Sequence, residues 1–325
     1  MNHKKILIIR FSSIGDIVLT TPIIRCAKKQ LKGTEIHFVT KEAFKSVLIH
    51  NPNIDKLYTF KEDVSELYDQ LKVENYDVLI DLHKNLRSLR LKQKLKVKSF
   101  SFNKLNIQKF LAVKLKQINK LPAMHIVDRY FETIAPLGVK NDGEALDYFI
   151  HENEKVDVTS LLMSNSQKKY VALVVGGSYY TKKIPLNKLA EICNTVKLPI
   201  IVLGGKEDKV IADELQKKFP QIINTCGQYS INQSASIIKQ AEWIITSDTG
   251  MMHIASAYNK KIISVWGNTI PEFGMAPYLP NNENKILEVK GLNCRPCSKL
   301  GYKRCPKKHF KCMNEIDFSG IKDLK

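Results

Sequence analysis

An aspartate stands directly after the first apolar run of the chain, in the stretch RFSSIGD at residues 10–16. Asp16 lies where an apolar strand pattern gives way to a helical pattern. One interpretation is helix capping, because an acid in the first turn gains roughly 0.3–1 kcal/mol from the helix dipole. The other is a carboxylate at the carboxyl end of a parallel strand, where open α/β sheets bind ligands. A carboxylate in that place could serve as a general base.

A second stretch whose residues could bind a ligand is SDTGMMHIASA at residues 247–257, which follows the apolar run WIIT. Asp248 and Thr249 can cap a helix, and Gly250 allows close approach to its backbone. His253 would lie one turn further on the same face. Free backbone N–H groups beside an imidazole favour a diphosphate site. The alternative is an ordinary capped helix with a core histidine.

Two further loops combine glycines with charged residues. VGGSYYTKKIP, at 175–185, places Lys182 and Lys183 before Pro185. VLGGKEDKVIADEL, at 202–215, places Glu207 and Asp208 just after Gly204 and Gly205. In a doubly wound domain these loops and that of Asp248 share one sheet edge. A lysine for phosphate, a carboxylate for ribose hydroxyls and a helix N-terminus together predict a nucleotide diphosphate pocket.

The elements that must position these residues follow a repeated strand-helix rhythm. Apolar runs at 5–10, 35–40, 56–60, 76–82 and 97–102 predict strands, with helices at 16–31 and 63–74 among the segments between them. After a polar segment at 151–169, strand patterns return at 170–176, 199–205, 243–247 and 261–267. This rhythm is typical of parallel sheets. We therefore expect an α/β chain of two Rossmann-like, doubly wound domains, at residues 1–155 and 156–325, facing a central cleft.

The charge is strongly positive and unevenly distributed. The 325 residues include 51 Lys and Arg against 32 Asp and Glu, and residues 84–120 contain no acid. Such a basic segment suits nucleic acid, an anionic membrane surface or a phosphorylated substrate, or else is simply a solvated face. No apolar run approaches the ~20 residues of a membrane span, and no secretory signal pattern is present, so we expect a cytoplasmic protein.

Four of the seven cysteines lie close together near the end of the chain. Cys294, Cys297, Cys305 and Cys312 have C-x2-C-x7-C-x6-C spacing, with His309 between the last two. A structural zinc site is chemically reasonable for such a set, but we do not favour it. The sequence contains neither G-x-x-x-x-G-K-[ST] nor G-x-G-x-x-G, which argues against a P-loop ATPase and against an NAD dehydrogenase.

Taken together, the motifs resemble a known enzyme family. Six blocks look like the signature blocks of glycosyltransferase family 9, the ADP-heptose:lipopolysaccharide heptosyltransferases. They are SSIGD at 12–16, DLHKNLRS at 81–88, the segment 182–185, GGKED at 204–208, SDTGMMHIA at 247–255 and WGNT at 266–269. The blocks occur in the family's order in both halves. The resemblance implies a GT-B fold, with the acceptor in the first domain and the nucleotide sugar in the second, and sugar transfer with inversion and without a catalytic metal.

The resemblance also implies residue roles. Asp16 matches the catalytic base. Ser13 and Gly15, in the same block, are expected to bind the acceptor, as is Arg87, which lies just beyond a strand end in the acid-free stretch. On the donor side, Lys182 matches the residue that binds phosphate, and Asp208, or alternatively Glu207, matches the acid that binds ribose. The residues that match the diphosphate-binding loop are Asp248, Thr249, Gly250 and His253. One departure is Ile184, where members often carry tryptophan before the proline; it affects the packing of that loop.

The expected partners are an ADP-sugar donor, with no further cofactor, and an anionic lipid-linked saccharide acceptor at the inner face of the inner membrane. Lys92, Lys94, Lys96 and Lys98 would contact anionic lipid, and no nucleic-acid partner is expected. The alternatives are a nucleotide-dependent oxidoreductase or methyltransferase, which lacks its glycine fingerprint here, and a nonenzymatic nucleic-acid binder, which lacks a recognition pattern.

Overall fold

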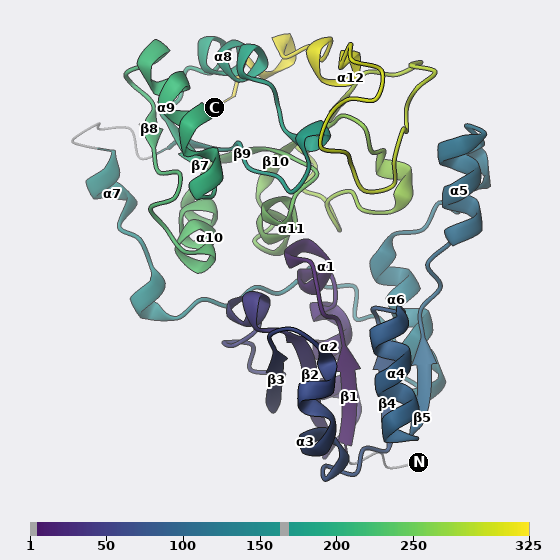
Figure 1. Ribbon diagram of the computed structural model, residues 1–325. Helices are drawn as coiled ribbons and strands as arrows, with labels where there is room; N and C mark the ends of the chain where they lie inside the picture. The colour runs from purple at the N-terminus through teal and green to yellow at the C-terminus, as the bar shows by residue number, and fades with distance from the viewer. Residues whose placement is uncertain (1–4, 163–168, 325) are drawn as a thin grey trace. The chain divides into compact units, whose positions relative to one another are not determined.

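Each half of the chain builds one parallel β-sheet with helices on both faces (Figure 1). The computed structural model describes residues 5–162 and 169–324. Contacts divide the chain into two units: unit 1 is Met1–Lys104 with Met124–Phe149, and unit 2 is Leu105–Ala123 with Ile150–Lys325. The expected boundary at residue 155 stays a prediction. The contacts add that Leu105–Ala123, which the sequence analysis placed in the first domain, packs with unit 2.

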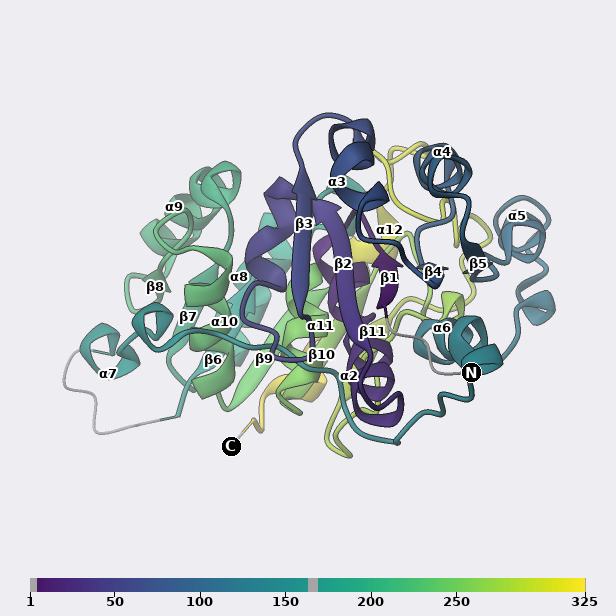
Figure 2. The same ribbon diagram turned by 90° about the horizontal axis from the view of Figure 1, so that it is seen from below.

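The sheet of unit 1 has the order β3-β2-β1-β4-β5, with all strands parallel. Its strands are β1 Lys5–Ile9, β2 Glu35–Lys41, β3 Lys56–Phe60, β4 Val78–Asp81 and β5 Lys98–Ser101. The central strands read as continuous apolar runs because both of their faces are covered. Figure 2 shows α3 (Tyr68–Lys72) and α4 (Leu86–Leu95) on one face, and α2 (Thr21–Gln30) and α6 (Ile126–Ile134) on the other.

The helix expected over residues 16–31 is in fact two helices, α1 (Ile14–Val18) and α2. Pro22 lies in the first turn of α2 and has no N–H to continue the hydrogen bonds of α1. The hydroxyls of Thr20 and Thr21 donate to the carbonyls of Ile17 and Val18, each at 2.7 Å. The break leaves α1 as a short helix that carries Asp16 directly behind β1.

The sheet of unit 2 has the order β11-β10-β9-β6-β7-β8, again all parallel. Its strands are β6 Val171–Val174, β7 Ile200–Leu203, β8 Ile223–Asn224, β9 Trp243–Ser247, β10 Lys261–Trp266 and β11 Lys285–Glu288. One core joins α8 (Leu186–Thr195) and α9 (Lys209–Lys218) to the last residues of the chain, and the other lies under α10 (Ile231–Gln240) and α11 (Gly250–Ala257). The two edge strands, β8 and β11, were not predicted because each is short and only half apolar.

The remaining elements are short. They are the helices α5 Asn106–Lys114, α7 Val158–Leu161 and α12 Lys311–Asn314, and the 3-10 segments η1 Glu42–Val47, η2 Val64–Leu67, η3 Ile118–Lys120, η4 Ala135–Leu137, η5 Glu152–Glu154, η6 Tyr180–Lys182, η7 Lys206–Asp208, η8 Pro271–Phe273 and η9 Ser319–Ile321. The polar segment expected at 151–169 contains η5 and α7, while its residues 163–168 lie outside the described part. Among the described residues, no helix combines the length and hydropathy needed to cross a bilayer.

The strand orders fix where ligands are expected. In each sheet the winding reverses between two neighbouring strands, β1 and β4 in unit 1, and β6 and β9 in unit 2. Loops at the carboxyl ends of such strands diverge to opposite faces and leave a crevice, which is where open α/β sheets bind ligands. The loops after β1, β6 and β9 contain Asp16, Lys182 and Asp248.

Candidate active site

Asp16 is held by two residues of its own loop. Its Oδ1 lies 2.6 Å from Nη2 of Arg10, and its Oδ2 accepts a hydrogen bond of 2.8 Å from the Ser13 hydroxyl. The backbone N–H of Ser13, the N-cap of α1, also donates to Asp16, at 3.3 Å. Asp16 therefore does cap the N-terminus of α1. Capping does not account for the buried arginine on the other oxygen.

Arg10 is fixed by the backbone around it. Its Nε donates to the carbonyl of Ser12 at 2.8 Å, and its Nη1 donates to the carbonyl of Leu82 at 2.5 Å. The guanidinium thus links the end of β1 to the end of β4. Its remaining nitrogen, Nη2, contacts Asp16. Sequence reasoning passed over Arg10, although its place at the end of an apolar strand, six residues before the acid, was visible.

The charges around Asp16 keep it ionised. Burial raises the pKa of Asp16, but the Arg10 charge and the hydrogen bonds from Ser13 outweigh it and lower the pKa to about 2. Burial also lowers the pKa of His83, as do the charges of Arg10 and Lys104, and it falls to about 3, so this imidazole is neutral. The Nδ1 of His83 is buried and has no hydrogen-bond partner among the described residues. His83 follows β4 and was not singled out from the sequence.

The other predicted acceptor residues lie near the same two strand ends. Gly15 is buried in α1, and Arg87 is half-buried in the first turn of α4. Asp81, at the end of β4, shapes the intervening loop because it accepts from the backbone N–H groups of His83 and Lys84, at 3.0 and 2.7 Å. The Ser88 hydroxyl donates to its other oxygen at 2.8 Å. This buried carboxylate explains the DLHKNLRS motif structurally.

Of the four lysines expected to contact lipid, Lys92 is already engaged inside the protein. Its Nζ lies 3.1 Å from Asp81 Oδ2 and donates to the Ser101 hydroxyl at 2.8 Å. A buried carboxylate needs such a partner, because an unpaired charge is costly in the interior. Lys94 and Lys98 lie over the rings of Tyr68 and Phe100. The expectation for Lys92 is therefore corrected.

In unit 2, the loops after β6, β9 and β10 meet at Asp248. Its Oδ2 lies 2.6 Å from Lys182 Nζ and accepts a hydrogen bond of 2.9 Å from the Thr269 hydroxyl. Lys182 and Asp248 are far apart in the sequence, and the parallel sheet brings their loops together as expected. Thr269, the last residue of WGNT, belonged to a recognised motif but had been given no role.

Asp208 and Lys183 form a second pair on the loops after β7 and β6. Lys183 Nζ lies 2.5 Å from Asp208 Oδ1, and the backbone N–H of Gly205 donates to Oδ2 at 3.0 Å. Asp208 is only 2% exposed. A Cβ at Gly176 would lie 2.7 Å from its Oδ2, so the glycine makes room for the carboxylate. Glu207, the alternative, instead folds over Gly205.

The diphosphate loop opens α11. Thr249 is the N-cap, Gly250 is the first helical residue, and the Thr249 and Thr246 hydroxyls are 3.1 Å apart. The first N–H groups of such a helix have no partner within it and favour an anion. His253 is 2% exposed in the first turn of α11, where the core-histidine interpretation would also place it.

The cysteine-rich segment, residues 291–313, contacts the loops after β10 and β6. Arg295 donates to the carbonyls of Gly267 and Thr269, at 2.7 and 2.9 Å, and pairs with Glu288 at 2.6 Å. On the other loop, Tyr302 N–H donates to the Thr181 hydroxyl at 2.8 Å. The segment therefore fixes the residues immediately beside Lys182 and Asp248.

Asn268 is another residue that sequence reasoning missed. It is 1% exposed, and neither its amide nitrogen nor its amide oxygen has a hydrogen-bond partner among the described residues. Leaving a buried amide unpaired costs about 1–3 kcal/mol, so such a group calls for an explanation. Its neighbour Thr269 contacts Asp248, which places this amide beside the proposed donor loops.

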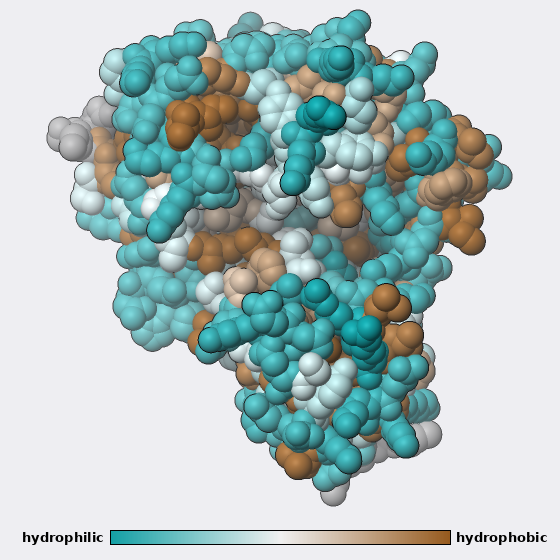
Figure 3. All heavy atoms as spheres, viewed as in Figure 1, coloured by the Kyte–Doolittle hydropathy of each residue, from teal (hydrophilic) through white to brown (hydrophobic). Residues whose placement is uncertain are grey.

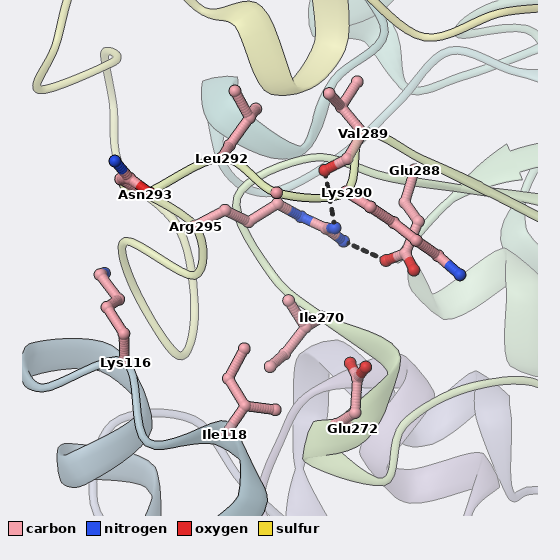
Figure 4. Close-up of a pocket in the computed structure, with 11 residues that line it drawn as sticks. Lys116, Ile118, Ile270, Glu272, Glu288, Val289, Lys290, Leu292, Asn293 and Arg295 are labelled. Atoms are coloured by element: carbon pink, nitrogen blue, oxygen red, sulfur yellow. Dashed lines mark hydrogen bonds and ion pairs between the residues drawn. The ribbon is translucent and has the colours of Figure 1, made fainter.

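A hollow of about 520 Å³ lies within unit 2 beside the Arg295 brace (Figure 4). Its walls are residues 288–293 and Arg295, with Ile270, Glu272, Lys116 and Ile118. Figure 4 shows the Arg295 guanidinium directed to Glu288 and to the carbonyl of Val289, so this arginine serves the protein itself. None of the site residues predicted from the sequence lines this hollow.

The four cysteines of this segment form no disulfide with one another or with the other described cysteines. Cys294 Sγ lies 3.9 Å from His309 Nε2, and Cys312 is buried. Burial, together with the nearby Cys297, Cys294 and Cys305, raises the pKa of Cys312 to about 12. Over residues 5–162 and 169–324, no group of three or more Cys, His, Asp or Glu side chains is placed to hold a metal ion.

Comparison with known proteins identifies relatives over most of the chain. The family model for glycosyltransferase family 9 (heptosyltransferase) matches residues 64–308. Lipopolysaccharide heptosyltransferase 1 of Campylobacter coli is 26% identical over 317 residues, which cover 88% of this chain and 89% of that protein.

Solved structures share the fold. E. coli ADP-heptose lps heptosyltransferase II gives a TM-score of 0.69 at 15% identity, over 96% of this chain and 98% of that one. E. coli heptosyltransferase WaaC with ADP gives 0.65 at 18% identity, over 87% and 92%. The expected α/β architecture of two parallel sheets, similar to the GT-B fold, is confirmed.

Proposed function

Because the chain belongs to glycosyltransferase family 9, the heptosyltransferases, we propose that it transfers a heptose from ADP-heptose to a saccharide acceptor of the cell envelope. The observation that carries the proposal is the cluster of Lys182, Asp248 and Thr269 at the reversal point of the second sheet. The Campylobacter relative is named a lipopolysaccharide heptosyltransferase, and one structural relative contains ADP.

The donor site is proposed to use the two ion pairs of unit 2. Lys182 binds the diphosphate, together with the N–H groups of Thr249 and Gly250 at the start of α11. Asp208, oriented by Gly205 and Lys183, accepts hydrogen bonds from the ribose hydroxyls. Each Asp208 oxygen accepts one hydrogen bond within the protein and keeps a further lone pair, so the carboxylate can accept from both hydroxyl groups of a vicinal diol.

The base is proposed to be Asp16. During inverting transfer an acceptor hydroxyl attacks the anomeric carbon from the face opposite the diphosphate, and the hydroxyl proton must leave as that bond forms. Asp16 Oδ2 accepts the proton, while Arg10 holds the carboxylate in position through Oδ1. A positioned base is typically worth ~10²–10⁴-fold in rate. Ser13, Gly15 and Arg87 are assigned to the acceptor.

Departure of the diphosphate needs stabilisation of the charge that develops on it. Lys182 and the N-terminus of α11 supply fixed positive charge and dipole for this purpose, so the mechanism we propose uses no metal. The acceptor is an anionic lipid-linked saccharide on the cytoplasmic side of the membrane, which fits the acid-free basic stretch 84–120.

The test is transfer by the wild-type protein and by Asp16→Asn, with ADP-heptose and a delipidated lipopolysaccharide-core acceptor. The variant should lose at least 100-fold in kcat, and its ADP affinity should stay within about twofold, because the substitution only replaces the base. Circular dichroism and thermal unfolding verify that it folds. Near-normal turnover would leave Asp16 with a capping role alone, and failure of ADP-heptose to support any transfer would remove the proposed donor.

A further inference from the structure

We propose that helix α5 is the surface through which this enzyme docks on an anionic lipid bilayer. The α5 face consists of Ile107, Phe110, Leu111 and Leu115. Ile107 is 73% exposed, Phe110 57% and Leu115 58%. Figure 3 shows hydrophobic surface over α5 on the outside of the protein. The proposal rests on the proposed function for the lipid-linked acceptor, and it adds the part of the chain that meets the lipid.

The α5 face is not simply the outside of a core helix. The opposite side of α5 is the packed one: Ala112 is buried against Ile270 and Phe273, and Val113 and Ile118 join the same cluster. At 3.6 residues per turn, residues 107, 110, 111 and 115 share one side of the helix. Exposed apolar residues gathered in this way mark an interaction site, whereas single exposed residues are normal.

The helix is attached firmly to unit 2. The Lys116 ammonium group, just beyond α5, donates to the carbonyls of Pro296 and Val113, at 2.7 and 2.8 Å. Lys109 lies over the Phe273 ring, with Nζ 5.7 Å from its centroid. The apolar side chains of α5 are therefore presented from a fixed platform, which limits the ordering entropy lost on docking.

Charge selects the partner. The α5 face carries Lys114 at its centre and has Lys120 beyond its end, and the whole stretch 84–120 has no acid. An apolar face flanked by lysines is the composition of helices that lie in the interface of anionic bilayers, where long lysine side chains reach outward to phosphate groups. A second copy of this chain would instead bring the same lysines together, at a formal charge of +19 per copy. The observations therefore favour lipid over self-association.

The first experiment measures cosedimentation of the full-length protein with phosphatidylcholine vesicles that contain phosphatidylglycerol, and with phosphatidylcholine vesicles alone. Binding should require the anionic lipid and weaken at high salt. The triple variant Ile107→Gln, Phe110→Gln, Leu115→Gln keeps good helix formers and should lose roughly tenfold or more in partition. Lys114→Glu with Lys120→Glu should lose about fivefold or more per site.

The matched control is Val210→Gln on α9. Val210 is 77% exposed, at least as much as any member of the α5 face, but it lies on a different helix of the same unit. Its vesicle binding should equal that of the wild type. A general effect of lower surface hydropathy would weaken Val210→Gln as well, and would overturn the assignment to α5.

A second readout follows insertion directly. Both native tryptophans, Trp243 and Trp266, are buried, so a new one at Phe110→Trp reports its own surroundings. Its emission should shift to the blue with anionic vesicles and be quenched by lipids brominated on the acyl chain. Unchanged emission in the presence of bound vesicles would refute insertion of α5.

These outcomes separate the docking proposal from the proposed function. If the triple variant loses vesicle binding but still transfers to a delipidated acceptor, both proposals stand. If the wild type binds vesicles through α5 but transfers no heptose, only the proposed function fails. If vesicle binding is unaffected by the α5 variants, or if light scattering shows a dimer that the triple variant dissociates, the docking proposal is wrong.

Discussion

The ion pair between Arg10 and Asp16 allows a prediction on pH dependence. The pKa of Asp16 lies at about 2 against an ordinary 3.8, a difference of nearly two pKa units. At 1.36 kcal/mol per unit, the site favours the carboxylate by about 2 kcal/mol. Burial opposes this preference, and the positive charge of Arg10 makes the largest contribution that lowers the pKa of Asp16. Removal of Arg10 should therefore raise the pKa of Asp16, because burial then acts without its main opponent.

The variant to make is Arg10→Met, which fills much of the same space without charge. If Asp16 is the base, wild-type kcat/KM should have no acidic limb above pH ~3, whereas the acidic limb of the variant should move to higher pH. At neutral pH its kcat should fall roughly tenfold or more, because the carboxylate is ionised but no longer held. Its ADP affinity should not change, since the residues assigned to the donor lie in unit 2.

The same pair predicts the pH dependence of stability. A carboxyl whose pKa is depressed on folding stabilises the protein above its unfolded pKa, and the stabilisation disappears as the pH falls through the folded value. The loss of unfolding free energy in Arg10→Met should thus be full above pH ~4 and shrink toward pH ~2. Urea titrations between these limits measure it.

Arg10→Lys is the matched control, since it keeps the charge and loses the fork that reaches Ser12 and Leu82. It should keep the acidic limb low while reducing kcat. An Arg10→Met enzyme that folds and shows no acidic limb down to pH ~3 would refute the argument that this arginine sets the ionisation of the base.

Three further predictions concern the donor site. Lys182→Ala should weaken ADP binding by about an order of magnitude in calorimetry, and His253→Ala by a few fold, because hydrogen bonds to a charged ammonium group are the stronger ones. Unchanged affinity in both variants would exclude the proposed pocket. Asn268→Leu should leave the melting temperature unchanged or raise it, since it removes an unpaired buried amide. The same variant should weaken ADP-heptose binding if that amide contacts the donor. A lower melting temperature with normal binding would contradict this. Transfer should persist in EDTA, and activity that is lost and then restored by one divalent ion would assign the leaving-group role to a metal.

The features that follow local rules were predictable from the sequence. Asp16 and Asp248 each follow an apolar strand, and within each parallel sheet the loops at the carboxyl ends share one edge whatever their separation in the chain. Strand alternation with helices therefore yielded the two sheets and placed Lys182 near Asp248 without any knowledge of distances.

What sequence reasoning missed depends on tertiary contacts. Lys183 and Lys182 are adjacent and chemically alike, and only the folded loops decide that Lys183 pairs with Asp208 while Lys182 pairs with Asp248. Arg10 reaches the carbonyl of Leu82, 72 residues away, which no periodicity encodes. The helix break at Pro22 is different, because proline inside an expected helix was a local signal that deserved more weight.

The contacts of residues 291–313 also govern how the chain can be cut or tagged. These residues follow the last strand, and their irregular backbone suggests a dispensable tail. Yet Gly267 is pressed against Met313 and Gly301 against Tyr179 so closely that a Cβ on either glycine would overlap its neighbour. Phe318 and Ile321, further along, are fully buried in the core of unit 2. Expression clones that stop after β11 would open that core and release the loops of Lys182 and Asp248.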